Sequence, residues 1–414
     1  MDSFSRALAR LIAVLVVICA LASPSFMGLT HDLGNAQAAP RKKAPKAPRA
    51  EPKQPQQPKD PLQRTPFTAD EQAAAAIAGI ADARVWGDSA DDFQRVLPTA
   101  PGPWLAISGG GADGAFGAGV LSGWSASGKR PEFAVVTGAS IGALISPYAF
   151  LGQALDGELR DNFTDITAAD IFEDRATPES LFDAWPLQRL LEKRVTPQML
   201  AAIAAEHRKG RRLLVATTNI DAGRRVIWNM GAIAQRADER ALKLFRQVLL
   251  ASSSIPGFFQ PVVIEVEANG KKFQELHLDG TVTAPFFVAP EAALSGGGAR
   301  LPINQLYVIV NSKLGSDFYA SDRNVKAILA RTIGVALTTE LRAELLLTTA
   351  AAQHLGIGFD AAYVPDSFAQ PSRSLFDREY MEALYKLGAE RGQAGTAFES
   401  ISTKALELRT GSPR

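Results

Sequence analysis

The stretch FAVVTGASIG, residues 133–142, decides the fold of this chain. Its first five residues are apolar or β-branched and predict a strand buried on both faces, and the apolar residues from Ile141 onward predict a helix. Between them stands Gly-x-Ser-x-Gly, the pattern of a nucleophile elbow, in which a sharp turn exposes a serine hydroxyl at the end of a strand. Gly138 and Gly142 allow the strand and the helix to pack closely around that turn. Ser140 is therefore the candidate nucleophile, and a turn without chemistry is the alternative.

A second glycine-rich stretch, SGGGADGAFG at residues 108–117, follows a predicted strand and leads into a predicted helix. Glycines permit unusual backbone angles, and N–H groups at the start of a helix point toward negative charge, so this loop can hold an anion. The glycines at 109, 111 and 114 also fit the dinucleotide-binding fingerprint, which needs an acidic residue after the next strand. That strand ends in the serine turn instead. This favours a hydrolase over a nucleotide-binding oxidoreductase.

The dipeptide Asp279-Gly280 follows a predicted strand at residues 273–278, which places a carboxylate at the rim of the sheet. A serine nucleophile needs a base within hydrogen-bond reach. Aspartate is a weak base at its ordinary pKa of about 3.9, but burial in an apolar cleft raises that pKa. A dyad of Ser140 and Asp279 is therefore chemically feasible, with a simple Asp-Gly turn as the alternative.

The chain has four histidines, and one of them falls in the N-terminal leader or linker. His207 stands at a basic helix end that we expect to be solvated, and His277 is expected to be a structural neighbour of the aspartate. His354 lies in a predicted helix. It supplies the alternative of an α/β-hydrolase triad made of Ser140, Asp279 and His354.

Strand-like and helix-like segments alternate along the chain. Four continuous apolar runs predict strands buried on both faces: 104–108, 133–137, 213–220 and 306–311. Helix-like segments lie between them, including residues 325–347 with apolar side chains at helical spacing. Two hairpins are expected, with turns at residues 221–223 and 269–270. The alternation predicts an α/β fold, in which a mostly parallel sheet carries helices on both faces. A helical stripe near the end is expected to pack in the core: Phe376, Tyr380, Leu384 and Leu387.

Together the motifs resemble those of the patatin-like phospholipases. That family combines a glycine-rich loop after its first strand, a Gly-x-Ser-x-Gly elbow and a distant Asp-Gly-Ala or Asp-Gly-Gly. Here Gly109–Gly114, Gly138–Gly142 and Asp279-Gly280-Thr281 appear in the same order. The segments ASSSIPGFFQP (251–261) and TNIDAG (218–223) also look like family segments. The resemblance covers residues 104–285.

The resemblance implies a three-layer α/β/α domain and acyl transfer through a covalent acyl-enzyme. Asp279 would take the proton of Ser140, whose oxygen attacks an ester carbonyl, without a metal or cofactor. Backbone N–H groups would hold the oxyanion, and the expected donors are Gly109, Gly110, Gly111 and Ala112. The glycines expected to shape the motifs are Gly114, Gly138, Gly142 and Gly280.

Two residues depart from the family pattern. Many relatives carry Arg or Lys where Asp113 stands, so the expected site lacks a cation near the oxyanion and depends on backbone N–H groups. Thr281 replaces the small third residue of Asp-Gly-Ala or Asp-Gly-Gly, which leaves Asp279 intact but changes the fit of its turn. The apolar segment PGFF, residues 256–259, is expected either to line an acyl channel or to pack in the core.

The composition is that of an ordinary globular protein. The 414 residues include 44 Lys and Arg against 43 Asp and Glu, a formal net charge of +1, so no overall field indicates a nucleic-acid partner. The single cysteine, Cys19, lies in an apolar N-terminal run, which excludes a thiol nucleophile from the predicted mature chain. The sequence shows no clear metal-ligand cluster, and no cofactor is expected.

The N-terminus has the features of an exported protein. Arg6 and Arg10 precede an apolar run of signal-peptide length. We expect a signal peptide over residues 1–22, with alternative cleavage near 38, and a periplasmic or envelope location; secretion or an uncleaved membrane anchor are the alternatives. Residues 39–66 are rich in Pro and Lys and predict a disordered linker, which either attracts an anionic membrane or serves as a solvated spacer. One patatin-like domain is expected over residues 67–409.

The expected substrate is a phospholipid or another acyl-ester lipid, with peripheral contact to membrane lipid. Phospholipids, lysophospholipids, acylglycerols and simple esters all fit the motifs, and the sequence points to no particular protein partner. A non-catalytic envelope protein that binds lipid is the remaining alternative.

Overall fold

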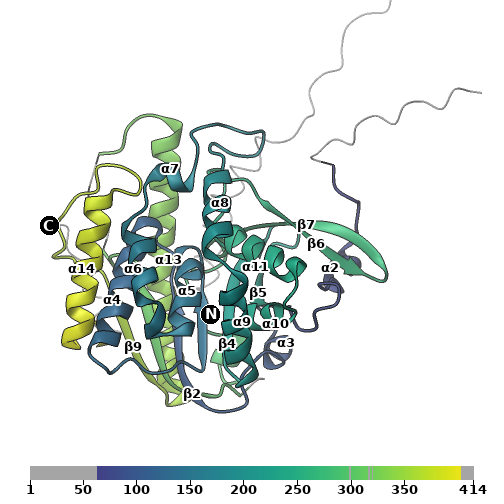
Figure 1. Cartoon of the computed structure of the whole chain (residues 1–414), viewed down its shortest axis with the longest axis horizontal. Helices are drawn as coiled ribbons and strands as arrows, with labels where there is room; N and C mark the ends of the chain where they lie inside the picture. The colour runs from purple at the N-terminus through teal and green to yellow at the C-terminus, as the bar shows by residue number, and fades with distance from the viewer. Residues whose placement is uncertain (1–62, 298–299, 316–317, 319, 402–414) are drawn as a thin grey trace, which may run out of the picture. The chain divides into compact units, whose positions relative to one another are not determined.

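The sheet at the centre of the described part of the chain has ten strands (Figure 1). A computed structural model describes residues 63–297, 300–315, 318 and 320–401, and these belong to one compact unit. The predicted signal peptide and most of the predicted linker fall in residues 1–62, outside the described residues. The strands are β1 (Arg84–Trp86), β2 (Gly102–Ile107), β3 (Val135–Gly138), β4 (Arg212–Asn219), β5 (Arg224–Asn229), β6 (Val262–Ala268), β7 (Lys271–Asp279), β8 (Ile303–Val310), β9 (Gly358–Tyr363) and β10 (Glu399–Ser400).

Parallel pairing dominates the middle of the sheet, whose order is β1-β5-β4-β3-β2-β8-β9-β10. The five strands from β4 to β9 in that order all run parallel, whereas the outer strands β1, β5 and β10 pair antiparallel. The hairpin of β6 and β7 joins the sheet where the end of β7 pairs with the end of β4. The predicted α/β fold with a mostly parallel central sheet is confirmed, and both predicted hairpins lie at their expected turns.

Helices cover both faces of this sheet. The longer ones are α4 (Gly114–Ala126), α5 (Ile141–Leu151), α6 (Asp156–Thr164), α8 (Trp185–Arg194), α9 (Pro197–Arg208), α11 (Glu239–Ser252), α13 (Val325–Leu355) and α14 (Arg378–Ala394). The short ones are α2 (Ala69–Ala73), α3 (Ala90–Gln94), α7 (Ala168–Ile171), α10 (Met230–Gln235), α12 (Glu291–Leu294) and the 3₁₀ turns η1 (Gly111–Asp113), η2 (Gln153–Leu155) and η3 (Gly280–Val282).

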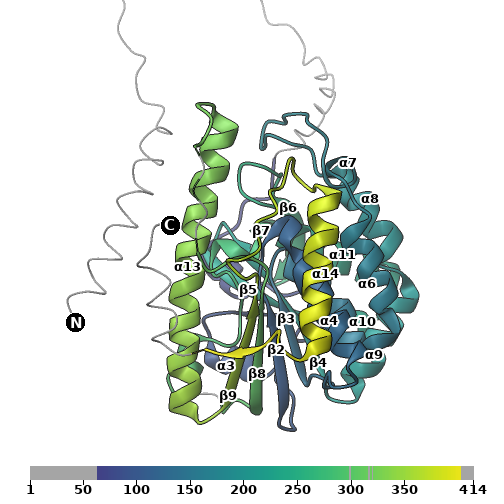
Figure 2. The same cartoon turned by 90° about the vertical axis from the view of Figure 1, so that its left-hand side faces the viewer.

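Two hydrophobic cores separate the three layers, and β2 shows how the sheet serves both. Leu105 and Ile107 point into the core beneath α4, α5 and α14, whereas Trp104 and Ala106 point into the core beneath α3, α12 and α13. Figure 2 shows α13 and α3 on one side of the sheet and the layer with α4 and α14 on the other. Because side chains alternate along a strand, a central strand buried on both faces is apolar throughout.

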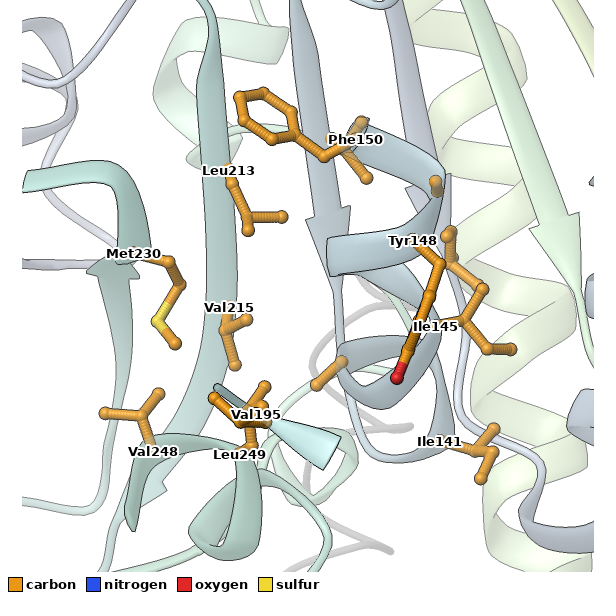
Figure 3. Close-up of a cluster of buried hydrophobic side chains, with 14 of the residues drawn as sticks. Ile141, Ile145, Tyr148, Phe150, Val195, Leu213, Val215, Met230, Val248 and Leu249 are labelled. Atoms are coloured by element: carbon orange, nitrogen blue, oxygen red, sulfur yellow. The ribbon is translucent and has the colours of Figure 1, made fainter. Parts of the chain in front are cut away.

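Helix α5 is held in the larger core by side chains of the neighbouring strand and helix (Figure 3). Ile145 and Phe150 of α5 belong to the same buried cluster as Leu213 and Val215 of β4 and Leu249 of α11. Burying each such side chain contributes roughly 1.5–3 kcal/mol. The packing therefore fixes the position of α5, and with it the turn that precedes Ile141.

The end of the chain differs from expectation at one residue. Leu384 is buried and Tyr380 and Leu387 pack against the core from α14, as the predicted stripe requires. Phe376 also packs against this core, but it lies before the helix begins and has a positive φ of 56°. Asp377 caps α14 instead, because its side chain accepts a hydrogen bond from the N–H of Tyr380.

The last residues of the predicted linker are held on the folded unit. Arg64 pairs with Asp221 at 2.6 Å, and the N–H of Thr65 donates to the side chain of Gln274 at 3.0 Å. None of the helices in the described ranges combines the length and hydropathy that crossing a membrane requires.

Candidate active site

Ser140 occupies the turn between β3 and α5 with the backbone of a nucleophile elbow. Its φ of 54° and ψ of −127° lie where non-glycine residues rarely stand, and such strain is held only by surrounding structure. The two motif glycines explain how the turn closes. A Cβ on Gly142 would lie 2.2 Å from the carbonyl oxygen of Ile107, and one on Gly138 would lie 2.4 Å from that of Gly142. No other residue fits at either position.

The structure brings Ser140 and Asp279 together. The Ser140 hydroxyl donates to Oδ2 of Asp279 at 2.7 Å, although the two residues are 139 positions apart. Ser140 is 7% exposed and Asp279 is 1% exposed, so the pair lies just beneath the surface at the carboxyl ends of the parallel strands. The two predicted chemical groups therefore have the geometry of a nucleophile with its base.

Thr281 holds the second oxygen of the Asp279 carboxylate. Both the N–H and the hydroxyl of Thr281 donate to Oδ1, at 2.8 and 2.7 Å, which leaves Oδ2 for the serine. The Asp279 backbone is fixed as well, because its N–H donates to the carbonyl of Ser254 and its carbonyl accepts from the hydroxyl of Thr218. The departure from the family pattern at Thr281 thus adds a hydrogen bond to the candidate base.

Burial raises the pKa of Asp279 to about 6 from an ordinary value of 3.8, because a buried carboxylate loses its hydration. The hydrogen bonds from the Thr281 N–H, the Ser140 hydroxyl and the Thr281 hydroxyl stabilise the charged form and limit this rise. A pKa near neutrality suits a group that must accept a proton and later return it. The sequence-based expectation that burial strengthens this base is confirmed.

The end of α11 supports the turn that carries Ser140. The N–H of Ser140 donates to Oγ of Ser252 at 3.0 Å, and that hydroxyl donates in turn to the carbonyl of Ala216 at 2.7 Å. Ser252 comes from the ASSSIP segment, whose family resemblance was visible in the sequence but whose contacts were not. Ser252 therefore ties the nucleophile turn to β4.

The glycine-rich loop presents backbone donors beside the serine. The N–H of Gly109 is engaged with the carbonyl of Pro285 at 3.0 Å. Among the described residues, none accepts a hydrogen bond from the N–H groups of Gly110, Gly111 or Ala112. Of the four expected oxyanion donors, these three have a free N–H. A Cβ on Gly109 would lie 3.1 Å from the Ser140 Cβ, so the loop runs directly against the nucleophile.

Asn311, which sequence reasoning missed, fastens this loop. Its side-chain oxygen accepts from the N–H of Gly117 at 3.1 Å, and its side-chain nitrogen donates to the carbonyl of Ser108 at 2.9 Å. The Asn311 N–H also donates to the hydroxyl of Ser108, and the residue is fully buried. A buried amide with every group bonded fixes its neighbours firmly. The available signal was its place directly after the apolar run of β8, where side chains meet the carboxyl edge.

Neither His277 nor His354 bonds to Ser140 or Asp279 in the described part of the chain. His277 is buried and its ring bonds to Thr217 and Glu275 rather than to the serine or aspartate. His354 lies at the end of α13, just before β9 begins, and is therefore at the amino edge of the parallel strands, opposite Ser140. The structure thus does not assemble the alternative triad.

The expectation that His207 is solvated was wrong. Its ring packs against α10, where a Cβ on Gly231 would lie 2.3 Å from Nδ1, and that nitrogen is buried without a hydrogen-bond partner in the described residues. Burial and the neighbouring charge of Arg212 lower the pKa of His207 to about 4. The ring is thus neutral and structural.

Other predicted features of the site have clear positions. Oδ1 of Asp113 accepts a hydrogen bond from the Tyr380 hydroxyl at 2.8 Å. The rings of the PGFF segment pack on a neighbouring loop, with Phe258 stacked on Phe182 at 5.8 Å and Phe259 near Phe172 at 6.1 Å. Within the described ranges, no group of three or more acidic, His or Cys side chains could hold a metal ion.

Comparison with known proteins gives a family match over the middle of the chain. Residues 105–291 match the family model described as Patatin-like phospholipase. Solved structures that resemble this one include the crystal structure of VipD from Legionella pneumophila, with 14% identity, a TM-score of 0.36, and coverage of 73% of this chain and 68% of that chain. No curated protein matches the chain in sequence.

Proposed function

We propose that this chain, which carries a patatin-like phospholipase domain at residues 105–291, hydrolyses carboxylic ester bonds of lipids with Ser140 as nucleophile and Asp279 as base. The family supports lipid acyl hydrolase activity in general. The observation that carries the finer proposal is the 2.7 Å hydrogen bond from the Ser140 hydroxyl to the buried Asp279 carboxylate at a strained elbow. The Gly110–Ala112 loop beside it supplies the expected oxyanion donors.

In the first half of the reaction, Asp279 accepts the hydroxyl proton while the Ser140 oxygen bonds to the ester carbonyl carbon. The carbonyl electron pair moves onto its oxygen, and the N–H groups of Gly110, Gly111 and Ala112 would stabilise that charge. Removing one such donor costs about 3 kcal/mol in other hydrolases. Collapse of the intermediate breaks the bond to the alcohol, which leaves with the proton from Asp279.

In the second half, Asp279 takes a proton from water and the hydroxide attacks the acyl carbon. The bond to the Ser140 oxygen breaks, the serine recovers its proton, and the fatty acid is released. The pKa of about 6 suits Asp279 to both directions of transfer, since the group is charged at neutral pH but is not a very weak base.

Fatty-acid release from mixed phospholipids and from p-nitrophenyl esters tests the proposal. We expect Ser140→Ala and Asp279→Asn to lower kcat by about 10⁴-fold or more while the fold is retained. His354→Ala should keep full activity, because His354 stands at the other edge of the sheet. Loss of activity in His354→Ala would favour the triad, and a folded wild type inactive on every ester would overturn catalysis.

We also propose that the chain is exported, on the basis of the basic and apolar pattern of residues 1–22. Cell fractionation with N-terminal sequencing of the mature chain tests this. A cleaved N-terminus near residue 22 or 38 in the periplasmic or envelope fraction is expected, and an intact chain in the cytosol would contradict it.

A further inference from the structure

The two halves of α13 have opposite surroundings. The second half packs on the sheet, where Leu341, Leu345 and Ala352 are buried. In the first half, residues 325–340, no side chain is buried, although the sequence VKAILARTIGVALTTE is mostly apolar. Val325 is 74% exposed and Ile328 is 54% exposed. A contiguous apolar segment of this kind in water marks an interaction surface.

This exposed half stands at the edge of the sheet that holds the dyad. The helix follows β8 and precedes the parallel strand β9, so Val325 starts at the carboxyl edge, where β3 ends at the serine turn. Figure 2 shows this part of α13 extending beyond the strands. A Cβ on Gly257, five residues after Ser252, would lie 3.4 Å from Leu329. The helix therefore adjoins the segment that supports the nucleophile.

Salt and cation–π contacts fix the helix in this position. Lys326 pairs with Asp174 at 2.7 Å and lies 4.7 Å above the ring of Phe182. Phe182 in turn stacks on Phe258. The exposed half is thus anchored at its start to the aromatic loop beside the candidate site, while the side chains of Val325, Ile328 and Val335 remain exposed.

The charge pattern of the segment selects one kind of partner. Its charged residues are Lys326, Arg331 and, at its last position, Glu340; Arg323 stands just before it, and no acidic residue occurs between Asp322 and Glu340. Apolar side chains interspersed with basic ones are typical of helices that lie in the head-group region of anionic lipid. A second copy of this chain fits less well, because a symmetric pairing of the segment would set two positively charged surfaces against each other.

We propose that residues 325–340 seat this chain on anionic lipid surfaces, with the dyad edge turned toward the lipid. The benefit of this docking to the enzyme rests on the proposed function. The docking itself can be measured without catalysis. Insertion of the apolar side chains would bring an ester bond to the edge where Ser140 lies, without requiring a lipid to leave the membrane and cross water.

Co-sedimentation with vesicles of phosphatidylcholine and phosphatidylglycerol tests the docking in the full-length chain. A triple variant carrying Val325→Gln, Ile328→Gln and Val335→Gln removes exposed apolar groups that contact no core, so folding should be unaffected. The matched control is Leu347→Gln, which is 58% exposed on the half of the same helix that packs on the sheet. Measurement at high salt suppresses the contribution of the basic linker.

We expect the triple variant to bind these vesicles about 100-fold more weakly than wild type. Leu347→Gln and Ser140→Ala should bind like wild type. Hydrolysis of a soluble p-nitrophenyl ester by the triple variant should be unchanged, while hydrolysis of vesicle lipid falls with binding.

The proposal is overturned if the triple variant binds vesicles as tightly as wild type does. It is also overturned if wild type forms a dimer that the triple variant does not form, while the triple variant still binds vesicles. If wild type binds vesicles through this segment but cleaves no ester, the docking stands and the proposed function fails. If it cleaves soluble esters but does not bind vesicles, the docking fails and the function stands.

Discussion

Two carboxylates on one face of β7 show how this fold separates a structural charge from a candidate base. Glu275 and Asp279 lie four residues apart on the same side of the strand, and both are fully buried. Glu275 forms an ion pair with Arg84 and a hydrogen bond with His277. Asp279, in contrast, receives hydrogen bonds only from neutral groups, the Ser140 hydroxyl and the two donors of Thr281.

The difference in partners reverses the effect of burial. Burial alone pushes the pKa of either carboxyl upward. For Glu275, the hydrogen bond from His277 and the charge of Arg84 outweigh burial, and the pKa is lowered. For Asp279, neutral donors only limit the rise, and the pKa reaches about 6. A carboxylate that must exchange protons is therefore one that the fold leaves without a cation.

The largest effect on stability is expected from removing the charge of Glu275. Glu275→Gln leaves the Arg84 guanidinium buried without its counter-ion, and we expect a loss of about 3 kcal/mol in the free energy of unfolding. Urea unfolding measures it. Activity per folded molecule should be nearly unchanged.

The double variant Arg84→Met with Glu275→Met removes both charges and should recover part of the lost stability. A Glu275→Gln protein that is as stable as wild type but inactive would instead show that Glu275 acts on the base.

The corresponding substitution at Asp279 should raise the free energy of unfolding instead of lowering it. Since the folded pKa of about 6 lies above the ordinary value of 3.8, Asp279 favours folding only while both states are protonated, and this contribution is lost as pH rises through 6. Asp279→Asn removes the buried charge, so at pH values well above 6 it should stabilise the protein by about 2 kcal/mol. Unfolding curves at neutral and acidic pH test this, and a gain that persists unchanged below pH 3.8 would contradict the explanation.

The pH dependence of activity tests whether burial raises the pKa of Asp279. In the proposed mechanism Asp279 must be charged to accept the serine proton, so kcat/KM for a soluble ester should fall as the pH drops through about 6, by about tenfold for each unit below it. A stopped assay across this range measures the acidic limb. A limb centred near 4 would indicate a base that burial does not perturb.

The smallest expected effect comes from Thr281. Thr281→Val keeps the methyl group that packs on Gly109 but removes a hydrogen bond to the charged carboxylate, so the acidic limb should move upward by roughly half a pH unit. Thr281→Ser keeps the hydroxyl and should leave the limb in place. Equal shifts in both variants would assign the effect to packing rather than to the hydroxyl.

The sequence predicted the fold, and it pointed to Ser140 and Asp279 as the candidate pair, because these signals are local. The β3–α5 turn needs its glycines within five residues, and Asp279-Gly280 stands at the end of a recognisable strand. The partners of these groups are not local: Ser252 reaches Ser140 across 112 positions, and Asn311 reaches Ser108 across 203. No short pattern encodes such contacts, so they became visible only in the folded chain.

Two wrong or incomplete expectations have the same physical origin. The charged neighbours of His207 indicated a solvated helix end, but the ring packs against a glycine of α10 that the local pattern could not reveal. Apolar spacing in residues 325–347 predicted a helix correctly. It did not show that only the second half of this helix meets the sheet, because periodicity reports an apolar face and not what covers it.

The strands at the two ends of the sheet are short, which affects whether copies of this protein can pair their strands. β1 has three residues and β10 has two, so each end offers few unpaired backbone groups to another molecule. Long exposed edges promote strand-to-strand aggregation, and brief ones suppress it. These two ends of the sheet are therefore poor templates for strand pairing between copies, whereas the seven-residue strand β6, which pairs with β7 and forms one isolated bridge to Ala76 in the described part of the chain, is a longer edge.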